Sequence, residues 1–321
     1  MPVTEATDYN PSFPYTNGHF NTIFPAMFRR QTPPAYERER IITSDDDFVD
    51  IDHLHKGSRG LAILCHGLEG SSRSQYIQGT AGILSKNGWD VTAINHRSCS
   101  GEMNKQLIMY HSGATWDLHL IIQKMAPDYD EIVLVGFSLG GNIVLKYLGD
   151  GIYPLHEKIK KVVAVSVPID LKGGSIEISK KKNKIYDWRF LKTLRQKAFQ
   201  KHQQYPEVIK IENIKKVKTL ADFDHYFTGP MHGFKDGLDY YTKCSSKQFL
   251  KNITIPTLLI QALDDPFLSA SCFPRSEAIA NNYLNLLLSK YGGHVGFTLP
   301  GSTYYWEEIK IASFINEVSL V

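Results

Sequence analysis

Short, largely apolar segments recur along this chain and alternate with amphipathic stretches. The apolar segments span residues 61–65, 91–94, 132–135, 162–167, 258–262 and 284–288. Because each one is continuous, it suits a strand of a parallel sheet that is covered on both faces. Helical spacing of apolar residues is found at 76–86, 115–124, 141–148 and 275–281. This alternation predicts an α/β fold with a doubly wound, mostly parallel sheet.

Two regions depart from this rhythm. Residues 38–43 and 48–54 alternate in polarity around the acidic turn at 44–47, which predicts an antiparallel hairpin on the sheet edge. Between Pro168 and Pro256 the strand pattern stops, with a helical pattern at 188–203 and an aromatic-rich segment at 223–241 that we expect to form loops. Because strands resume afterwards, we expect a single domain over residues 1–321 with a helical cap inserted at about 172–250.

Composition narrows the class of protein. The chain has 321 residues, of which 42% are hydrophobic and 21% charged, as is usual for a soluble globular protein. No window approaches the ~20 apolar residues of a membrane span, and the first 20 residues lack the pattern of a secretory signal. The four cysteines have no paired spacing. Together these features predict reduced thiols in a cytoplasmic protein without integral membrane association.

Positive charge is concentrated in the expected cap. Residues 172–250 hold 17 Lys or Arg against 8 Asp or Glu, whereas the whole chain has a net charge of only +3. We interpret this as a solvated lysine face, and as the surface through which peripheral contact with a membrane would occur. The basic run at 180–184 lacks the interleaved aromatic residues of a single-strand nucleic-acid groove, so no nucleic-acid partner is expected.

The clearest chemical signal is the turn Gly136-Phe137-Ser138-Leu139-Gly140, which joins the strand at 132–135 to the helix at 141–148. In a G-x-S-x-G turn the serine sits on a tight, strained corner, and the glycines avoid collisions with the neighbouring strand and helix. The hydroxyl is then raised above the carboxyl edge of the sheet, near the positive end of the helix. Ser138 is therefore the candidate nucleophile.

A serine hydroxyl needs a base to accept its proton and an acid to orient that base. In folds that carry this turn, the chain order is serine, acid, histidine. His294 lies in a glycine-rich loop just after the last apolar segment, so we expect it to be the base. Asp264 and Asp265 follow the segment at 258–262. We favour Asp265 as the acid because it directly precedes a proline, and Asp264 is the alternative.

Two backbone N–H groups should stabilise the negative oxygen that forms during acyl transfer. One is that of Leu139, directly after the candidate nucleophile, and the other that of Leu68, in the His-Gly loop after the strand at 61–65. His66 opens this loop and is expected to brace it. His66 and Arg97 are also candidate pocket-lining residues, although Arg97 has a second interpretation as the ion-pair partner of Glu102.

Several motifs spread over nearly the whole chain resemble those of the YheT-type α/β-hydrolases. They are Gly18-His19-Phe20-Asn21-Thr22, His66-Gly67-Leu68-Glu69-Gly70-Ser71-Ser72, Asn95-His96-Arg97-Ser98-Cys99-Ser100-Gly101-Glu102, Tyr110-His111-Ser112-Gly113, the serine turn, His232-Gly233-Phe234, Tyr240-Tyr241, Asp264-Asp265-Pro266-Phe267 and Gly293-His294-Val295-Gly296-Phe297. The resemblance implies an α/β-hydrolase fold and a triad that falls on Ser138, Asp265 and His294. It also implies action on acyl esters or thioesters, because the relatives include bacterial hydrolases, phospholipase-like enzymes and medium-chain acyl-CoA:alcohol acyltransferases.

The sequence therefore predicts a cofactor-independent serine hydrolase that cleaves small-molecule carboxylic esters through an acyl-enzyme. Two alternatives stay open. One is transfer of a medium-chain acyl group to an alcohol, which uses the same triad, and the other is a non-catalytic binding protein on a hydrolase scaffold. No metal site is expected, because His53 and His55 alternate on the hairpin without a third ligand nearby.

Overall fold

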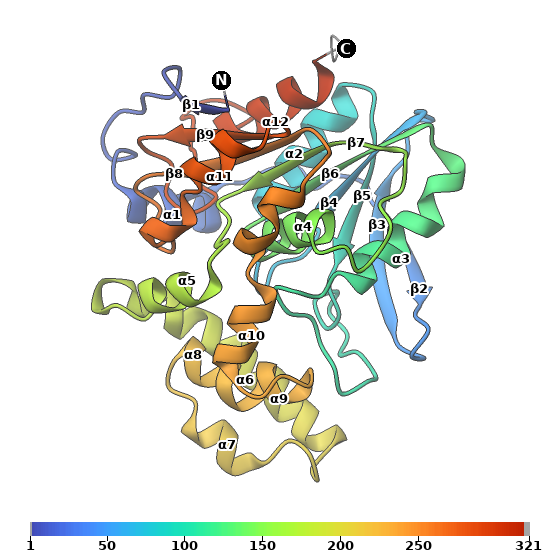
Figure 1. Cartoon of the computed structure of the whole chain (residues 1–321), viewed down its shortest axis with the longest axis vertical. Coiled ribbons are helices and arrows are strands. Elements are labelled where there is room, and N and C mark those ends of the chain that lie inside the picture. Colours follow the sequence, from blue (N-terminus) through green and yellow to red (C-terminus); the bar gives the residue numbers. More distant parts are fainter. Residues whose placement is uncertain (1, 318–321) are drawn as a thin grey trace.

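The computed structural model of the chain describes residues 2–317, which are built around one nine-stranded sheet (Figure 1). The strands lie in the order β1-β9-β8-β7-β6-β4-β5-β3-β2. All neighbours from β1 to β5 in that order are parallel, and β5, β3 and β2 pair antiparallel. The strands are β1 (Val3–Glu5), β2 (Glu37–Ile42), β3 (Phe48–Leu54), β4 (Gly60–Cys65), β5 (Asp90–Asn95), β6 (Glu131–Phe137), β7 (Ile159–Val165), β8 (Thr257–Ala262) and β9 (Leu284–Ser289).

The predicted α/β fold is confirmed. The six continuous apolar segments form β4 to β9, and the predicted hairpin forms β2 and β3 on the sheet edge, with Ile41 opposite Val49. The prediction lacks β1, a three-residue strand that pairs with β9 through Val3 and Leu286. A strand this short carries no readable pattern of its own.

The central strands are mainly apolar because helices cover both faces of the sheet. Along β4, Leu61 and Ile63 pack into one core cluster, whereas Ala62 and Leu64 pack into the other. One face is covered by α3 (Trp116–Met125), α4 (Leu139–Gly149) and α11 (Arg275–Ala280), and the other by α2 (Gln75–Lys86) and α12 (Trp306–Asn316).

Between β7 and β8 the chain is helical and forms the lower part of the molecule in Figure 1. We call residues 172–250 the cap. Its elements are α5 (Leu171–Ile178), η2 (Lys181–Asn183), α6 (Lys184–Gln204), α7 (Ile211–Lys216), α8 (Leu220–Phe223), η3 (Asp224–Thr228), α9 (Gly229–Met231), α10 (Gly237–Cys244) and η4 (Ser246–Asn252). The expectation of loops at 223–241 is wrong, because short helices occupy most of this segment. Phe223 and Phe227 pack together there, with ring centroids 5.2 Å apart, inside a separate hydrophobic cluster.

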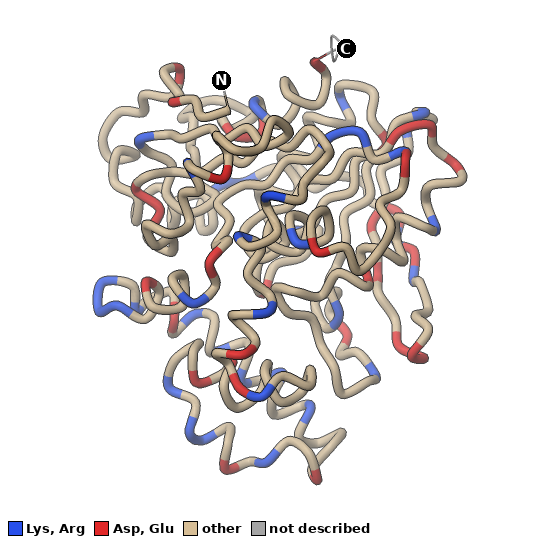
Figure 2. Tube along the Cα trace, viewed as in Figure 1, with Lys and Arg blue, Asp and Glu red and all other residues tan. Residues whose placement is uncertain are grey.

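The surface of the cap is basic. Lys and Arg outnumber Asp and Glu along it, and the run at 180–184 forms the turn between α5 and α6 (Figure 2). Within residues 2–317, no helix is long and apolar enough to cross a membrane.

The fold gathers the loops that carry the candidate site. Because β4, β6, β8 and β9 are parallel, their carboxyl ends meet at one edge of the sheet. The loops that follow these strands contain Leu68, Ser138, Asp265 and His294, respectively. The cap packs against the same edge, where its residues face Leu68 and Leu139 across a small cavity.

Candidate active site

Ser138 stands at the corner between β6 and α4, on a strained backbone. Its φ of 52° and ψ of −118° lie outside the regions that L-residues usually adopt. A Cβ on Gly136 would come within 2.6 Å of the Gly140 carbonyl oxygen, and one on Gly140 would come within 2.3 Å of the Cys65 carbonyl oxygen. The Ser138 N–H donates to the Val165 carbonyl at 2.9 Å and so ties the corner to the next strand. Both glycines are therefore needed for this turn to form.

His294 connects Ser138 to a buried carboxylate. Its Nε2 lies 2.9 Å from Ser138 Oγ, and its Nδ1 lies 2.9 Å from Asp265 Oδ2. Asp265 is also held in place, because its Oδ1 accepts the Phe267 N–H at 2.8 Å. The Phe267 ring packs on the imidazole with centroids 4.1 Å apart. The structure thus brings together, in one hydrogen-bonded line, three residues from three separate loops.

Asp264 has a different set of contacts. Its Oδ1 accepts the Gly293 N–H at 2.8 Å, and its buried Oδ2 has no hydrogen-bond partner among the described residues. Burial raises the pKa of Asp264 to about 6. Burial also raises the pKa of Asp265, and the neighbouring His294 opposes this rise. Asp265, and not Asp264, is the carboxylate in hydrogen-bond contact with His294.

The loop that contains Leu68 lies directly against Ser138. A Cβ on Gly67 would come within 3.1 Å of Ser138 Cβ. The N–H groups on either side of Leu68 are taken by tyrosine hydroxyls, since Gly67 donates to Tyr76 at 2.9 Å and Glu69 donates to Tyr110 at 2.8 Å. The Leu139 N–H is the first of α4, where an amide has no partner within the helix. The N–H groups of Leu68 and Leu139 therefore remain the candidates for the oxyanion amides.

His66 acts as a brace between two loops. Its Nδ1 donates to the Gly67 carbonyl at 2.7 Å, and its Nε2 accepts the His96 N–H at 3.1 Å. Burial lowers the pKa of His66 well below its usual value, which is consistent with a neutral ring in this tautomer. Its ring nitrogens are therefore fully used within the protein.

Arg97 is buried in a network of aspartates. Its Nε and Nη2 donate to Asp117, each at 2.9 Å, and its Nη1 donates to Asp45 at 2.6 Å. The expected pair with Glu102 is wrong, because Glu102 binds Arg40 at 2.7 Å instead. Arg97 borders an open groove, not the small cavity that Leu68 and Leu139 line, and its charge is neutralised by the carboxylates around it.

Two hydroxyl groups hold the loop that contains His294, and the sequence analysis did not identify either of them. Thr22 Oγ1 accepts the His294 N–H at 2.8 Å, and Ser166 Oγ accepts the Val295 N–H at 3.0 Å. Thr22 belongs to the N-terminal motif at 18–22, which is the signal that could have identified it. For Ser166, which lies just after β7, we find no comparable signal.

A cavity of about 90 Å³ lies next to the two candidate oxyanion amides. Leu68 and Leu139 form one wall, and Leu194, Leu220 and Phe223 of the cap form another. Its surroundings are mainly apolar. Within residues 2–317, no group of three or more His, Cys, Asp or Glu side chains is placed to hold a metal ion.

Comparisons with known proteins agree with this architecture. The model of the α/β hydrolase fold family matches residues 62–297. The chain is 32% identical to YheT of Escherichia coli (strain K12), over 98% of this chain and 94% of that protein. It is 27% identical to phospholipase ABHD3 of Homo sapiens, over 92% of this chain and 75% of that protein.

Solved structures extend the comparison to more distant proteins. The esterase Pf2001 of Pyrococcus furiosus has a TM-score of 0.58 to this chain at 16% sequence identity, and the match covers 91% of this chain and 95% of that chain. At this identity the likeness supports the fold alone. The family match and the similarity to YheT go further: the chain belongs to the α/β-hydrolase family, and within it to the YheT-type hydrolases.

Proposed function

We propose that the protein is a serine hydrolase of carboxylic esters, with Ser138 as nucleophile, His294 as general base and Asp265 as the group that orients the base. Family membership makes the chain a hydrolase of the ester-cleaving kind. The observation that carries the finer proposal is the hydrogen-bonded line from Ser138 Oγ through both ring nitrogens of His294 to Asp265 Oδ2, with both distances at 2.9 Å.

In the first half of the reaction, Ser138 Oγ attacks the ester carbonyl carbon while its proton passes to His294 Nε2. The carbonyl oxygen becomes negative and accepts hydrogen bonds from the N–H groups of Leu68 and Leu139. The tetrahedral intermediate then breaks its bond to the alcohol oxygen, which takes the proton from His294. The alcohol leaves, and the acyl group remains on Ser138 as an ester.

In the second half, water takes the place of the alcohol. His294 Nε2 accepts a proton from the water, which attacks the acyl carbon and forms a second oxyanion at the same amides. Collapse of this intermediate returns the proton to Ser138 Oγ and releases the carboxylic acid. Throughout, Asp265 Oδ2 accepts a hydrogen bond from the Nδ1–H of His294 and stabilises the imidazolium that forms in each half.

The surroundings of the site suit an apolar acyl group. We propose that residues 172–250 act as a cap on a single domain, because their side chains supply an apolar wall to the cavity beside the candidate oxyanion amides. The related phospholipase ABHD3 is consistent with an acyl ester substrate. A small-molecule acyl ester is therefore the substrate class we expect.

Hydrolysis of p-nitrophenyl esters tests the proposal. Ser138→Ala should lower kcat by about 10⁶-fold, because no other group can form the acyl-enzyme. Ser179→Ala, an exposed serine at the end of α5, is the matched control and should keep the wild-type rate. Substantial turnover by Ser138→Ala would contradict the assignment of the nucleophile.

Product analysis separates hydrolysis from acyl transfer, which uses the same triad. With a medium-chain ester and added short alcohols, hydrolysis predicts free carboxylic acid as the main product. Predominant formation of the new ester would show an acyltransferase instead. Failure to turn over any ester in a broad panel would favour the non-catalytic alternative.

A further inference from the structure

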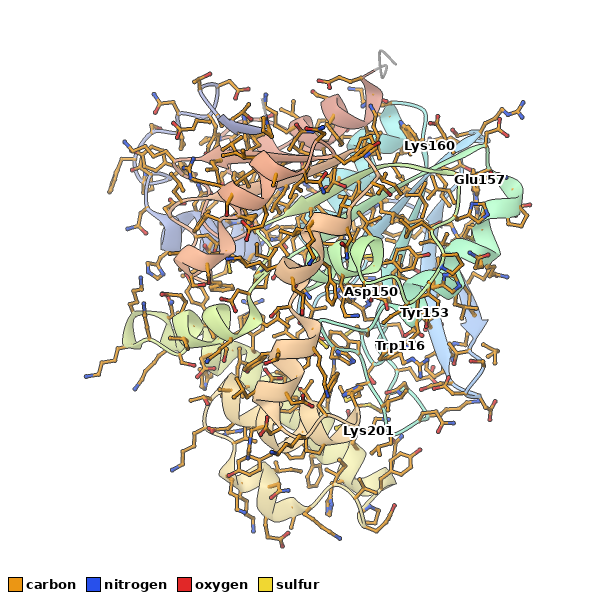
Figure 3. All side chains as sticks on the ribbon, viewed as in Figure 1. Trp116, Asp150, Tyr153, Glu157, Lys160 and Lys201 are labelled. Atoms are coloured by element: carbon orange, nitrogen blue, oxygen red, sulfur yellow. The ribbon has the colours of Figure 1, made fainter. Side chains whose placement is uncertain are left out.

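Two hollows that cap residues help to line share three of their lining residues. The inner one is the cavity of about 90 Å³ beside the candidate oxyanion amides. The outer one is an open groove of about 680 Å³, which Trp116, Asp150 and Tyr153 border near α4 (Figure 3). Three residues line both hollows, and we call them the partition: His111, Met231 and His232.

Hydrogen bonds fix the two imidazoles of the partition. The Nδ1 of His232 donates to the Thr228 carbonyl at 2.8 Å, and its Nε2 accepts the Met109 N–H at 3.2 Å. The Nδ1 of His111 accepts the Gly113 N–H at 3.0 Å. Burial lowers the pKa of both histidines, so both rings are neutral and keep these roles. Their centroids lie 4.5 Å apart, and neither ring can turn without losing a hydrogen bond.

Met231 is the adjustable part of the partition. It is buried at the end of α9, in the same hydrophobic cluster as Phe223 and Phe227. A thioether has no strong hydrogen-bonding group to anchor it, and its unbranched chain can change shape to suit different neighbours. A rotamer change at Met231 would therefore join the two hollows at a lower cost than a movement of either histidine.

The outer groove suits a hydrocarbon occupant. Trp116, Phe234 and Phe249 supply aromatic surface to it. The basic side chains that border the groove are each paired with an aspartate: Arg97 with Asp117, Lys146 with Asp150 and Lys243 with Asp239. Because these charges are already satisfied, the groove offers aromatic faces more readily than a binding site for an anionic group.

We infer that Met231 closes the far end of the acyl-chain site, and that the outer groove takes the end of longer acyl chains when Met231 moves aside. This inference rests on the proposed esterase function. A short acyl chain fits within the inner cavity and stops at the partition. A longer chain must displace Met231 before its end reaches the aromatic surface of the groove.

Chain-length profiles of two Met231 variants test the inference, with p-nitrophenyl esters that differ only in the acyl group. Met231→Ala should raise the ratio of kcat/KM for dodecanoate to that for butanoate by at least about tenfold, because each newly buried methylene contributes about fourfold. Met231→Phe places a larger, stiffer side chain in the partition and should lower the ratio. Leu191→Ala is the matched control: Leu191 lies in the same hydrophobic cluster but lines neither hollow, so its ratio should match the wild type.

The outcomes separate this inference from the function on which it rests. If the wild type hydrolyses esters but the ratio does not respond to Met231→Ala, the inference is wrong and the proposed function stands. An equal shift in Leu191→Ala would also overturn the inference, since general loosening of the cap would then explain the effect. If the wild type hydrolyses no ester at any chain length, both proposals are wrong.

Discussion

Replacing Asp265 by asparagine should reverse the hydrogen bonding of His294 while keeping the shape of the side chain. Asp265 Oδ1 accepts the Phe267 N–H at 2.8 Å, so the amide oxygen of Asp265→Asn is required at that position. The NH₂ group then replaces Oδ2, 2.9 Å from His294 Nδ1, and donates a hydrogen bond to it. A neutral imidazole must therefore carry its proton on Nε2, where it can no longer accept the proton of Ser138.

The expected cost of this exchange is about 10⁴-fold in kcat, which corresponds to about 5.4 kcal/mol. Steady-state hydrolysis of a p-nitrophenyl ester near neutral pH measures it. Asp264→Asn is the matched control, because an amide oxygen can still accept the Gly293 N–H, and its kcat should fall by less than about tenfold. Near wild-type turnover in Asp265→Asn would refute the reasoning. A fall in kcat of well over tenfold in Asp264→Asn would also refute it.

Three further predictions concern stability, and urea unfolding measures each. Gly140→Ala should cost about 2–3 kcal/mol, since its Cβ would lie 2.3 Å from the Cys65 carbonyl oxygen; unchanged stability would contradict the tight packing of the turn. Lys197→Met should cost about 3 kcal/mol, because it leaves the buried carboxylate of Glu69 without the cation 2.7 Å away; a neutral effect would mean that this ion pair does not stabilise the fold. Burial raises the pKa of Asp224 to about 6, above its unfolded value near 3.9. The unfolded chain therefore loses this proton first, so the free energy of unfolding is highest below about pH 4 and falls as the pH rises through 6. Asp224→Asn should therefore gain stability relative to the wild type between pH 4 and pH 7, by up to about 3 kcal/mol, and a difference that stays constant with pH would contradict this.

Local patterns predicted the sheet well because the causes of its strands are local. A strand covered on both faces is mainly apolar, and β4 to β9 each contain a largely apolar segment in the sequence. The turn at Ser138 is readable for a similar reason, since its strained backbone requires glycine at particular nearby positions. These constraints act within a few residues, so a single sequence reveals them.

Contacts between distant segments were not readable in this way. Thr22 supports His294 from 272 positions away, and no periodicity or spacing connects the two. The sequence favoured Asp265 over Asp264 only from its place before a proline, whereas the contact with His294 depends on how one loop turns toward another. Arg97 forms ion pairs with Asp117 and Asp45, which are distant in sequence, so the nearby Glu102 was the wrong choice of ion-pair partner.

The cap was the least predictable region. Its helices after residue 219 are short, so no helical period extends far enough to be recognised. Their side chains pack in a hydrophobic cluster formed mostly by cap residues, and such packing supplies most of the stability of short helices. The position of Met231 in the partition depends on the same packing, so the sequence alone does not reveal it.

The most direct test of the central claim is covalent labelling by a fluorophosphonate, followed by mass spectrometry of the intact protein and its peptides. The phosphonate mimics the tetrahedral intermediate and reacts with a serine that is activated by its base. We predict one adduct per chain, located on Ser138, that is absent from Ser138→Ala and strongly reduced in His294→Ala. An adduct on another residue, or undiminished labelling of Ser138→Ala, would contradict the account.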